Sequence, residues 1–136
     1  MEIAFHTNKN LPQAALKKVY NDVQWTAYTR DLPMLQKALL QSLDVISAWD
    51  QEELVGLIRV VGDGVTIVYI QDLLVRTDYQ NRGIATRLME QALARYEKVR
   101  QKVLLTEEAP DVRHFYEKHG FQSCDQGTLV AFAKLE

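Results

Sequence analysis

Residues 72–89 read DLLVRTDYQNRGIATRLM, and this stretch decides the fold. An apolar run ends at Val75, a short polar loop follows, and apolar residues at helical spacing begin directly after Gly83. The stretch therefore predicts a strand, a loop and a helix. A helix start presents unpaired N–H groups and a partial positive charge, and residues 80–89 contain no acid to oppose an anion. The pattern favours a phosphate site at this helix start.

The loop leaves one alternative open. Gly83 and Ala85 leave room for a ligand beside the backbone, and Arg82 and Arg87 add positive charge. The loop has neither the Lys-Ser/Thr pair of a Walker-type loop nor the three glycines of a dinucleotide fingerprint. Judged by itself, the stretch is equally typical of an ordinary helix start whose glycine allows close packing.

Periodicity in the rest of the chain predicts an α/β (α+β) domain, with a mixed central sheet of six to seven strands flanked by four helices. The strands are expected at 2–7, 45–50, 54–61, 65–75, 102–105 and 128–135, with a short further strand at 121–123. The helices are expected at 11–21, 32–43, 82–96 and 110–119. Asp31 is the expected N-cap of the second helix, and Gly120 the C-terminal cap residue of the last. The nearly all-apolar segment 65–75 is expected to be a central strand buried on both faces.

Composition excludes several classes of protein. The chain has 136 residues, which fits one domain over residues 1–136, and its formal net charge of -2 lacks the basic footprint of a nucleic-acid-binding protein. No apolar run approaches the roughly 20 residues of a membrane helix, and the N-terminus lacks the pattern of a secretory signal. Cys124 is the only cysteine and the three histidines have no metal-ligand spacing, so we expect neither a disulfide nor a metal site. We expect a cytoplasmic protein that binds neither nucleic acid nor membrane.

A second motif, FYEKHGF at residues 115–121, changes the interpretation of the first. Together with QNRGIA at 80–85 and the predicted order of elements, it makes the chain resemble the GNAT superfamily of N-acetyltransferases over nearly its whole length. The acetyl-CoA loop of that superfamily has the form Gln/Arg-x-x-Gly-x-Gly/Ala, which Gln80, Gly83 and Ala85 match. The late motif resembles the superfamily's aromatic-Tyr-x-x-x-Gly-Phe segment. The resemblance implies a GNAT fold and an acetyl-CoA-dependent N-acetyltransferase, which is a kind of acyltransferase.

The resemblance also implies roles for individual residues. Backbone N–H groups from 82 to 86 would hold the pyrophosphate of CoA, with the Thr86 hydroxyl adding a bond. The cofactor-binding residues of this loop and helix start are Gln80, Asn81, Arg82, Gly83, Ile84, Ala85 and Thr86. The strand residues Leu73, Leu74 and Val75 would pair with the pantetheine arm beside a bulge, and the N–H of Leu74 would polarise the thioester carbonyl. Tyr116 falls at the superfamily's general-acid position, against the cofactor.

The chemistry of acetyl transfer gives independent reasons for an acid and a base. An amine attacks a thioester only when it is neutral, and a free alkylamine has a pKa of about 10, so its proton needs an acceptor. Asp72 is the candidate base, because on an alternating strand it would share a face with Val68, Ile70 and Leu74 and lose solvation there. Tyr116 is the candidate acid for the departing thiolate. Each has a structural alternative: Asp72 as a partner for backbone N–H groups or a helix cap, and Tyr116 as a core aromatic residue.

The acceptor site has weaker signals. In this fold it is usually walled by the first two helices and their connection, which here contains Trp25 and Tyr28. These two rings and Asp72 are the predicted substrate-binding residues, although the rings would equally serve to anchor the loop to the core. An asparagine that touches the cofactor in many members is replaced by Ala109, and Thr106 is the candidate substitute. A limited likeness to the branch with plant-type serotonin acetyltransferases favours a small amine over a protein lysine.

Two classes of function remain. The first is an N-acetyltransferase that moves an acetyl group from acetyl-CoA to a primary amine of a small molecule, by direct attack in a ternary complex. The second is a non-catalytic, regulatory acyl-CoA-binding module, which would need the 82–86 loop but neither Asp72 nor Tyr116. Transfer to a protein or aminoacyl-tRNA amine is a third alternative, and the mildly acidic charge weighs against the RNA version. The identity of the amine, the use of other acyl groups and the formation of a homodimer stay open.

Overall fold

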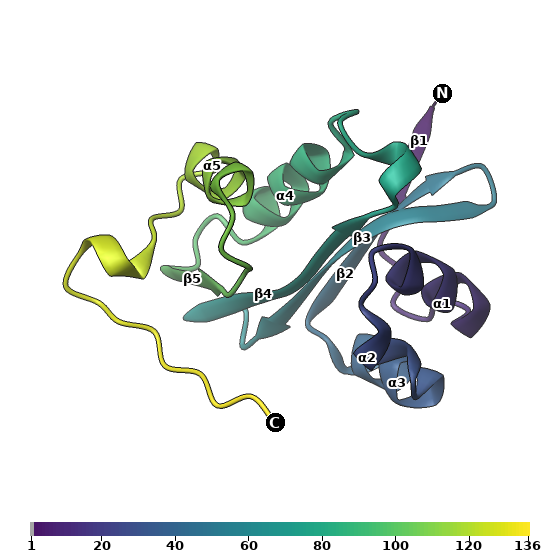
Figure 1. Cartoon of the computed structure of the whole chain (residues 1–136), viewed down its shortest axis with the longest axis horizontal. Helices are drawn as coiled ribbons and strands as arrows, with labels where there is room; N and C mark the ends of the chain where they lie inside the picture. The colour runs from purple at the N-terminus through teal and green to yellow at the C-terminus, as the bar shows by residue number, and fades with distance from the viewer. Residues whose placement is uncertain (1) are drawn as a thin grey trace. The chain divides into compact units, whose positions relative to one another are not determined.

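The computed structural model describes residues 2–136, which form two compact units with their boundary between Leu105 and Thr106. The first unit is a sheet with helices on both faces (Figure 1). Its strands are β1 (Ile3–His6), β2 (Asp44–Asp50), β3 (Glu53–Gly62), β4 (Ile67–Val75) and β5 (Gln101–Leu104). Its helices are α1 (Gln13–Asp22), α2 (Thr26–Thr29), α3 (Leu32–Gln41) and α4 (Ile84–Arg95), with a 3-10 turn at Thr77–Tyr79. Helices α1, α2 and α3 lie on one side of the sheet, and α4 lies on the other.

The sheet is mixed, as the sequence predicted. Its order is β1-β2-β3-β4-β5, and every neighbouring pair is antiparallel except β4 and β5, which are parallel because α4 carries the chain back between them. Strand β3 is buried along nearly its whole length, whereas β4 alternates between buried and partly exposed positions. The prediction that residues 65–75 are buried on both faces is therefore wrong: Ile67, Tyr69 and Leu73 are partly exposed, and Val65 lies before the strand with 75% of its surface exposed.

The second unit contains helix α5 (Pro110–Lys118) and a 3-10 turn at Cys124–Gln126. Pro110 stands in the first turn of α5, where its missing N–H costs no hydrogen bond. Gly120 follows the helix with a φ of 89°, a conformation that glycine adopts without strain. Both predicted signals for this helix are confirmed.

The strands expected at 121–123 and 128–135 do not form, and the apolar side chains of Leu129, Val130, Phe132 and Leu135 are exposed. An apolar run becomes a strand only where another strand pairs with it, and the run itself carries no information about that partner. Residues 2–136 therefore contain five strands and five α-helices, not six to seven strands and four helices. The additional helix is α2, whose four residues are too few to leave a periodic signal.

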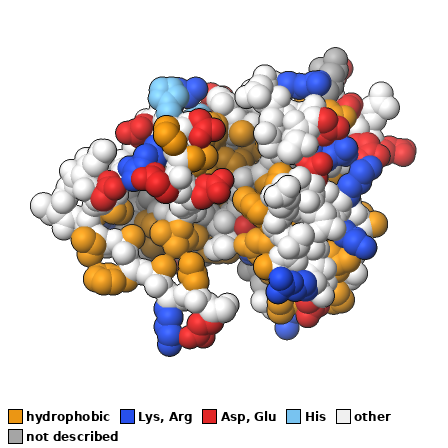
Figure 2. Space-filling model, in the orientation of Figure 1, with side chains coloured by type: hydrophobic (Ala, Val, Ile, Leu, Met, Phe, Trp, Pro, Cys, Tyr) orange, Lys and Arg blue, Asp and Glu red, His pale blue; other side chains and the backbone are white. Residues whose placement is uncertain are grey.

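Charged side chains of both signs are mixed on the face drawn in Figure 2, in keeping with the formal net charge of -2. Within residues 2–136, no helix combines the length and the apolar composition needed to cross a membrane. In the same residues, no group of three or more His, Cys, Asp or Glu side chains is placed to hold a metal ion.

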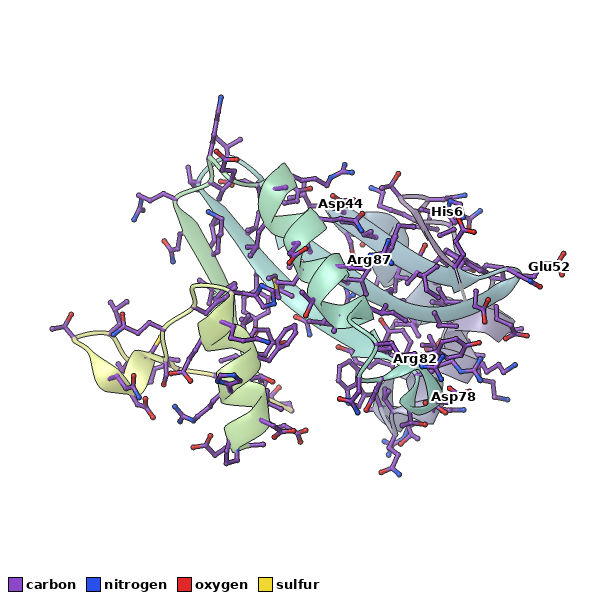
Figure 3. The ribbon with its side chains drawn as sticks, turned by 90° about the horizontal axis from the view of Figure 1, so that it is seen from above. His6, Asp44, Glu52, Asp78, Arg82 and Arg87 are labelled. Carbon is purple, nitrogen blue, oxygen red and sulfur yellow. The ribbon has the colours of Figure 1, made fainter. Side chains whose placement is uncertain are left out.

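Helix α4 runs along the face of the sheet that is opposite to α1. Figure 3 shows Arg82 beside the start of this helix and Arg87 further along it. The Gly83 carbonyl accepts the first helical hydrogen bond, from the Arg87 N–H at 3.0 Å. The loop that the sequence singled out therefore ends at the helix start that it predicted.

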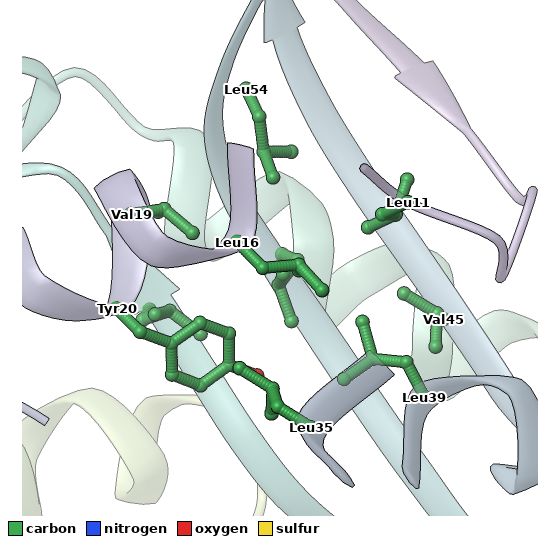
Figure 4. Close-up of a cluster of buried hydrophobic side chains, with 10 residues drawn as sticks. Leu11, Leu16, Val19, Tyr20, Leu35, Leu39, Val45 and Leu54 are labelled. Carbon is green, nitrogen blue, oxygen red and sulfur yellow. The ribbon is translucent and has the colours of Figure 1, made fainter. Parts of the chain in front are cut away.

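The core that positions the site lies between the sheet and helices α1 and α3 (Figure 4). Its members are Leu11, Leu16, Val19, Tyr20, Leu35, Leu39, Val45, Leu54, Leu57 and Leu74. Burial of each such side chain contributes roughly 1.5–3 kcal/mol, so this cluster fixes the helices firmly against the sheet. The predicted N-cap Asp31 accepts from the Met34 N–H at 3.1 Å and starts α3.

Candidate active site

Strand β4 carries a bulge at Gln71 that changes what the strand presents to its neighbours. Arg59 of β3 pairs with Asp72, and the next residue, Val60, pairs with Ile70, so Gln71 is an extra residue without a partner in β3. An extra residue reverses the alternation of side chains and of backbone groups beyond it. The resemblance to the GNAT superfamily implied such a bulge in this strand, and the structure has one.

Backbone hydrogen bonds give the direction of the N–H and C=O groups beyond the bulge. The Arg76 N–H donates to a β3 carbonyl at 2.8 Å, so alternation turns the backbone groups of Leu74 towards β3 and those of Leu73 and Val75 towards the opposite edge. The side-chain amide of Gln80 donates to the Val75 carbonyl at 2.9 Å, which agrees with this direction. Residue Leu74 therefore directs its N–H into the sheet.

The edge of β4 that faces β5 is paired only in part. Pairing with β5 ends at Ile70 and Leu104, one residue before the bulge. Beyond that point, Leu73 and Val75 direct their backbone groups to an edge that β5 does not occupy. This unpaired edge matches the opening that the resemblance implies for a pantetheine arm.

Helix α4 begins directly after Gly83, whose φ of 81° lies in the left-handed region. Asn81 is also left-handed, with a φ of 63°. Backbone of this kind turns successive N–H groups to one side and forms a concavity that binds anions. None of the described side chains caps the helix start, and a Cβ on Gly83 would meet no described atom within 4 Å. Since glycine is not required here for close packing, the residues present fit a phosphate better than they fit the packing alternative.

Two arginine side chains at the loop lie against one aromatic ring. The guanidinium groups of Arg76 and Arg82 lie 5.6 and 5.5 Å from the centre of the Tyr79 ring. That of Arg87 lies 4.5 Å from the centre of the Phe5 ring. The contacts of Arg82 and Arg87 hold positive charge near the start of α4, as a site for a phosphate requires, whereas Arg76 is ion-paired with Glu53 and Asp78 at 3.3 Å each.

Asp72 is almost fully buried, with 2% of its surface exposed, and it accepts hydrogen bonds from three side chains. Its Oδ2 accepts from Arg59 Nε at 2.7 Å and from the Tyr20 hydroxyl at 2.9 Å. Its Oδ1 accepts from the Tyr28 hydroxyl at 2.8 Å. A carboxylate with three donors is a well-satisfied buried group, which favours a structural role for Asp72 over that of a base, although its donors are side chains and not the backbone N–H groups or helix end that were expected.

The apolar surroundings expected for Asp72 are confirmed for Leu74, which shares its face of the sheet, and are wrong for Val68 and Ile70. Directly paired residues share a face of the sheet, and Asp72 pairs with Arg59, which lies two residues from Leu57 of the core cluster. Ile70 pairs with the neighbour of Arg59 and therefore lies on the other face, together with Val68. The bulge moves Asp72 away from those two apolar side chains and towards α1 and α2.

Trp25 and Tyr28, the predicted acceptor residues, lie on the same face of the sheet as Asp72. Their ring centres are 6.4 Å apart, and the buried Tyr20 ring lies 6.2 Å from Trp25 and 5.0 Å from Tyr28. Burial raises the pKa of Tyr28, and the charge of Asp72 raises it further, so its hydroxyl keeps its proton at neutral pH. Trp25 is 37% exposed and Tyr28 is partly buried, so the rings both anchor the connection to the core and reach the surface.

Tyr116 belongs to the second unit, where its ring packs edge-on against Phe115 and Phe121 at 5.2 and 5.9 Å. Burial raises the pKa of Tyr116, and a hydrogen bond with Thr106 acts in the opposite direction. Tyr116 therefore holds a proton at neutral pH, which a general acid must do. Thr106 is engaged with this hydroxyl, and Ala109 forms the N-cap of α5 without a capping side chain.

Sequence reasoning missed Arg59 and Gln71 as parts of the site, and it missed Tyr20 as a buried hydrogen-bond donor in the core beneath it. Arg59 had a readable signal, because a basic residue inside the apolar run GLIRVV requires a buried partner of opposite charge. Tyr20 had none beyond its place on the apolar face of a helix. Gln71 had none either, because the position of a bulge depends on the partner strand.

Comparison with known proteins agrees with this geometry. Residues 12–133 match the model of the family described as "Acetyltransferase (GNAT) domain". The sequence is 26% identical over 135 residues to the uncharacterized N-acetyltransferase ycf52 of Porphyra purpurea, covering 96% of this chain and 76% of that protein.

Solved structures give the same result. An acetyltransferase of the GNAT family from Streptococcus pneumoniae TIGR4 has a TM-score of 0.87 and 32% identity, covering 99% of this chain and 98% of that one. The PaiA N-acetyltransferase from Thermoplasma acidophilum, solved in complex with coenzyme A, shares the fold with a TM-score of 0.74 and 16% identity, covering 90% of this chain and 91% of that one. Because the family match spans most of the sequence, this chain is a member of the GNAT acetyltransferase family.

Proposed function

We propose that this GNAT acetyltransferase moves an acetyl group from acetyl-CoA to a primary amine of a small molecule, by direct attack in a ternary complex. The observation that carries the proposal is the combination of an uncapped helix start at Gly83 with a strand edge at Leu73 and Val75 that no other strand pairs with, among the described residues. One strand, loop and helix present both features. This suits a ligand that has a diphosphate and an extended amide-bearing arm.

Acetyl-CoA is the proposed cofactor, and the coenzyme A complex of the PaiA relative supports it. Backbone N–H groups from residues 82–86, with the Thr86 hydroxyl, would hold the pyrophosphate. Gln80 holds the loop to the end of β4 through its hydrogen bond with Val75. When bound, acetyl-CoA supplies the activated thioester.

The oxyanion of the tetrahedral intermediate needs a hydrogen-bond donor at the open edge of β4. The resemblance to the superfamily assigned this role to the N–H of Leu74. Alternation along β4 turns that group towards β3, and it turns the N–H of Leu73 outwards. We therefore assign the role to Leu73.

Tyr116 is the proposed general acid, which gives its proton to the departing thiolate and is reprotonated from solvent. The three hydrogen bonds on Asp72 support a positioning role for this carboxylate. The amine proton then leaves through a water chain or Glu107. We also propose that residues 1–136 act as one acetyltransferase domain in the cytoplasm, since the family match runs through both compact units.

Turnover of acetyl-CoA by the purified chain tests the proposed function. Release of free CoA is measured with phenethylamine, with 1,4-diaminobutane and with a lysine-containing peptide. We expect turnover with a small amine, and a loss of about 100-fold in Tyr116→Phe without a change in acetyl-CoA binding. Tyr96→Phe is the matched control, because it removes a hydroxyl that donates to Asp44 and should stay within about twofold of wild type.

The other outcomes point to other functions. Acetyl-CoA binding without turnover of any amine would support a regulatory binding module. Turnover of the peptide, without turnover of either small amine, would indicate that the acceptor is a protein. Unchanged turnover in Tyr116→Phe would remove this tyrosine from the mechanism and leave the family assignment intact.

A further inference from the structure

Three side chains form a small surface patch beside the bulge of β4, and we call it the Tyr28 patch: Trp25, Tyr28 and Gln71. Trp25 is 37% exposed, Tyr28 is partly buried and Gln71 is exposed. Gln71 stands two residues before Leu73, whose N–H faces the open edge of the same strand. An acceptor on this patch would therefore lie close to the proposed thioester position.

Among the described residues, the Tyr28 hydroxyl makes two hydrogen bonds, which leave one of its lone pairs unused. A phenol hydroxyl has one proton and two lone pairs. The proton is donated to Asp72 Oδ1 at 2.8 Å, and one lone pair accepts from Gln71 Nε2 at 3.1 Å. Since the proton is committed to a buried carboxylate, this hydroxyl meets a ligand only as an acceptor. An incoming N–H group can use the free lone pair or take the place of the exposed Gln71 amide.

The charges beneath the patch cancel. Arg59 and Asp72 form an ion pair at 2.7 Å, with only 8% and 1% of their side chains exposed. The Arg59 guanidinium carbon lies 6.0 Å from the centre of the Tyr28 ring. An acceptor with a second ammonium group would find no net negative charge here, and it would approach a buried guanidinium. The patch therefore suits one N–H donor on an apolar or aromatic body, which the ring of Trp25 can cover.

We infer that the Tyr28 hydroxyl accepts the hydrogen bond of the acceptor's amino group, and that the Gln71 amide is the group that this amine displaces. Arg59 and Asp72 act as positioning residues, because they fix the direction of the Tyr28 proton without contact with the acceptor. This inference rests on the proposed function and narrows it to monoamines with an apolar or aromatic body.

Steady-state kinetics with phenethylamine test the contact, because two tyrosines donate to the same carboxylate and only one reaches the surface. In Tyr28→Phe we expect the KM for phenethylamine to rise about tenfold, which corresponds to about 1.4 kcal/mol, while the KM for acetyl-CoA stays unchanged. Tyr20→Phe is the matched control: its hydroxyl also donates to Asp72, but the residue is fully buried. This variant should lower the melting temperature and leave the KM for phenethylamine unchanged.

Two further experiments test whether the amine displaces the Gln71 amide and whether the site disfavours a second ammonium group. Gln71→Ala removes the competing amide, so the KM for phenethylamine should fall about twofold relative to wild type. In wild type itself, 1,4-diaminobutane should be a poorer acceptor than phenethylamine. A rise of the KM in Gln71→Ala, a preference for the diamine, or equal KM changes in Tyr28→Phe and Tyr20→Phe would each overturn the inference.

A binding measurement separates failure of this inference from failure of the proposed function. Calorimetric titration of phenethylamine into the CoA-saturated protein detects the contact without turnover. We expect weaker binding in Tyr28→Phe than in wild type and Tyr20→Phe, even if no amine is acetylated. Equal binding by a folded Tyr28→Phe, with the melting temperature as the check on folding, would overturn the inference while the proposed function stands.

Discussion

At the scale of the residue, Asp72 shows how its partners decide what a carboxylate can do. It lies on the strand that the sequence identified, and its hydrogen-bond partners there are a guanidinium and two hydroxyl groups. Arg59 and Asp72 are both buried, so removal of one partner leaves an uncompensated charge. The pair is therefore expected to serve stability and the orientation of Tyr28.

The Asp72→Asn variant separates this role from that of a base. Because a buried ion pair is broken, the free energy of unfolding should fall by about 3–5 kcal/mol. The ratio of wild-type to variant kcat, at saturating acetyl-CoA, should stay flat between about pH 6 and pH 10, since the amine proton is not transferred to Asp72. Arg59→Gln is the control, because it breaks the same pair without removing a proton acceptor. A ratio that is largest near neutral pH and shrinks at high pH, seen only for Asp72→Asn, would restore Asp72 as the base.

At the scale of the element, the bulge in β4 does two things at once. It turns Asp72 towards α1 and α2, and it turns the backbone groups of Leu73 and Val75 to the edge that β5 leaves unpaired. The loop and α4 then follow from the end of the same strand. A single extra residue thus relates the proposed acceptor side to the proposed cofactor side.

Amide hydrogen exchange tests the direction of these backbone groups. In the free protein the N–H of Leu73 should exchange faster than that of Leu74, because Leu74 faces β3 within the ladder. Addition of acetyl-CoA should slow the exchange of Leu73 and leave that of Leu74 nearly unchanged. Protection that appears at Leu74 and not at Leu73 would return the oxyanion role to Leu74 and contradict the alternation argument.

At the scale of the whole molecule, local signals predicted well and pairing partners did not. The apolar run before the loop, the helix after Gly83 and the caps at Asp31 and Gly120 all depend on neighbours in sequence, and they were readable. The run 128–135 read as a strand but has no strand partner in the described chain. The bulge and the network around Asp72 depend on contacts with β3, α1 and α2. Local sequence patterns do not show which segments contact each other, so they could not predict either feature.

The central claim is that the start of α4 binds CoA, and calorimetric titration of CoA into matched glycine variants tests it most directly. Gly83 and Gly120 have φ values of 81° and 89°, and a Cβ on either would meet no described atom within 4 Å. Valine at either position therefore carries a similar backbone strain of about 1–3 kcal/mol, but only at Gly83 would it intrude on a bound phosphate. We expect Gly120→Val to bind CoA like wild type, and Gly83→Val to lose binding together with the rise in melting temperature that CoA gives wild type. CoA binding by Gly83→Val as tight as that of wild type would contradict the account.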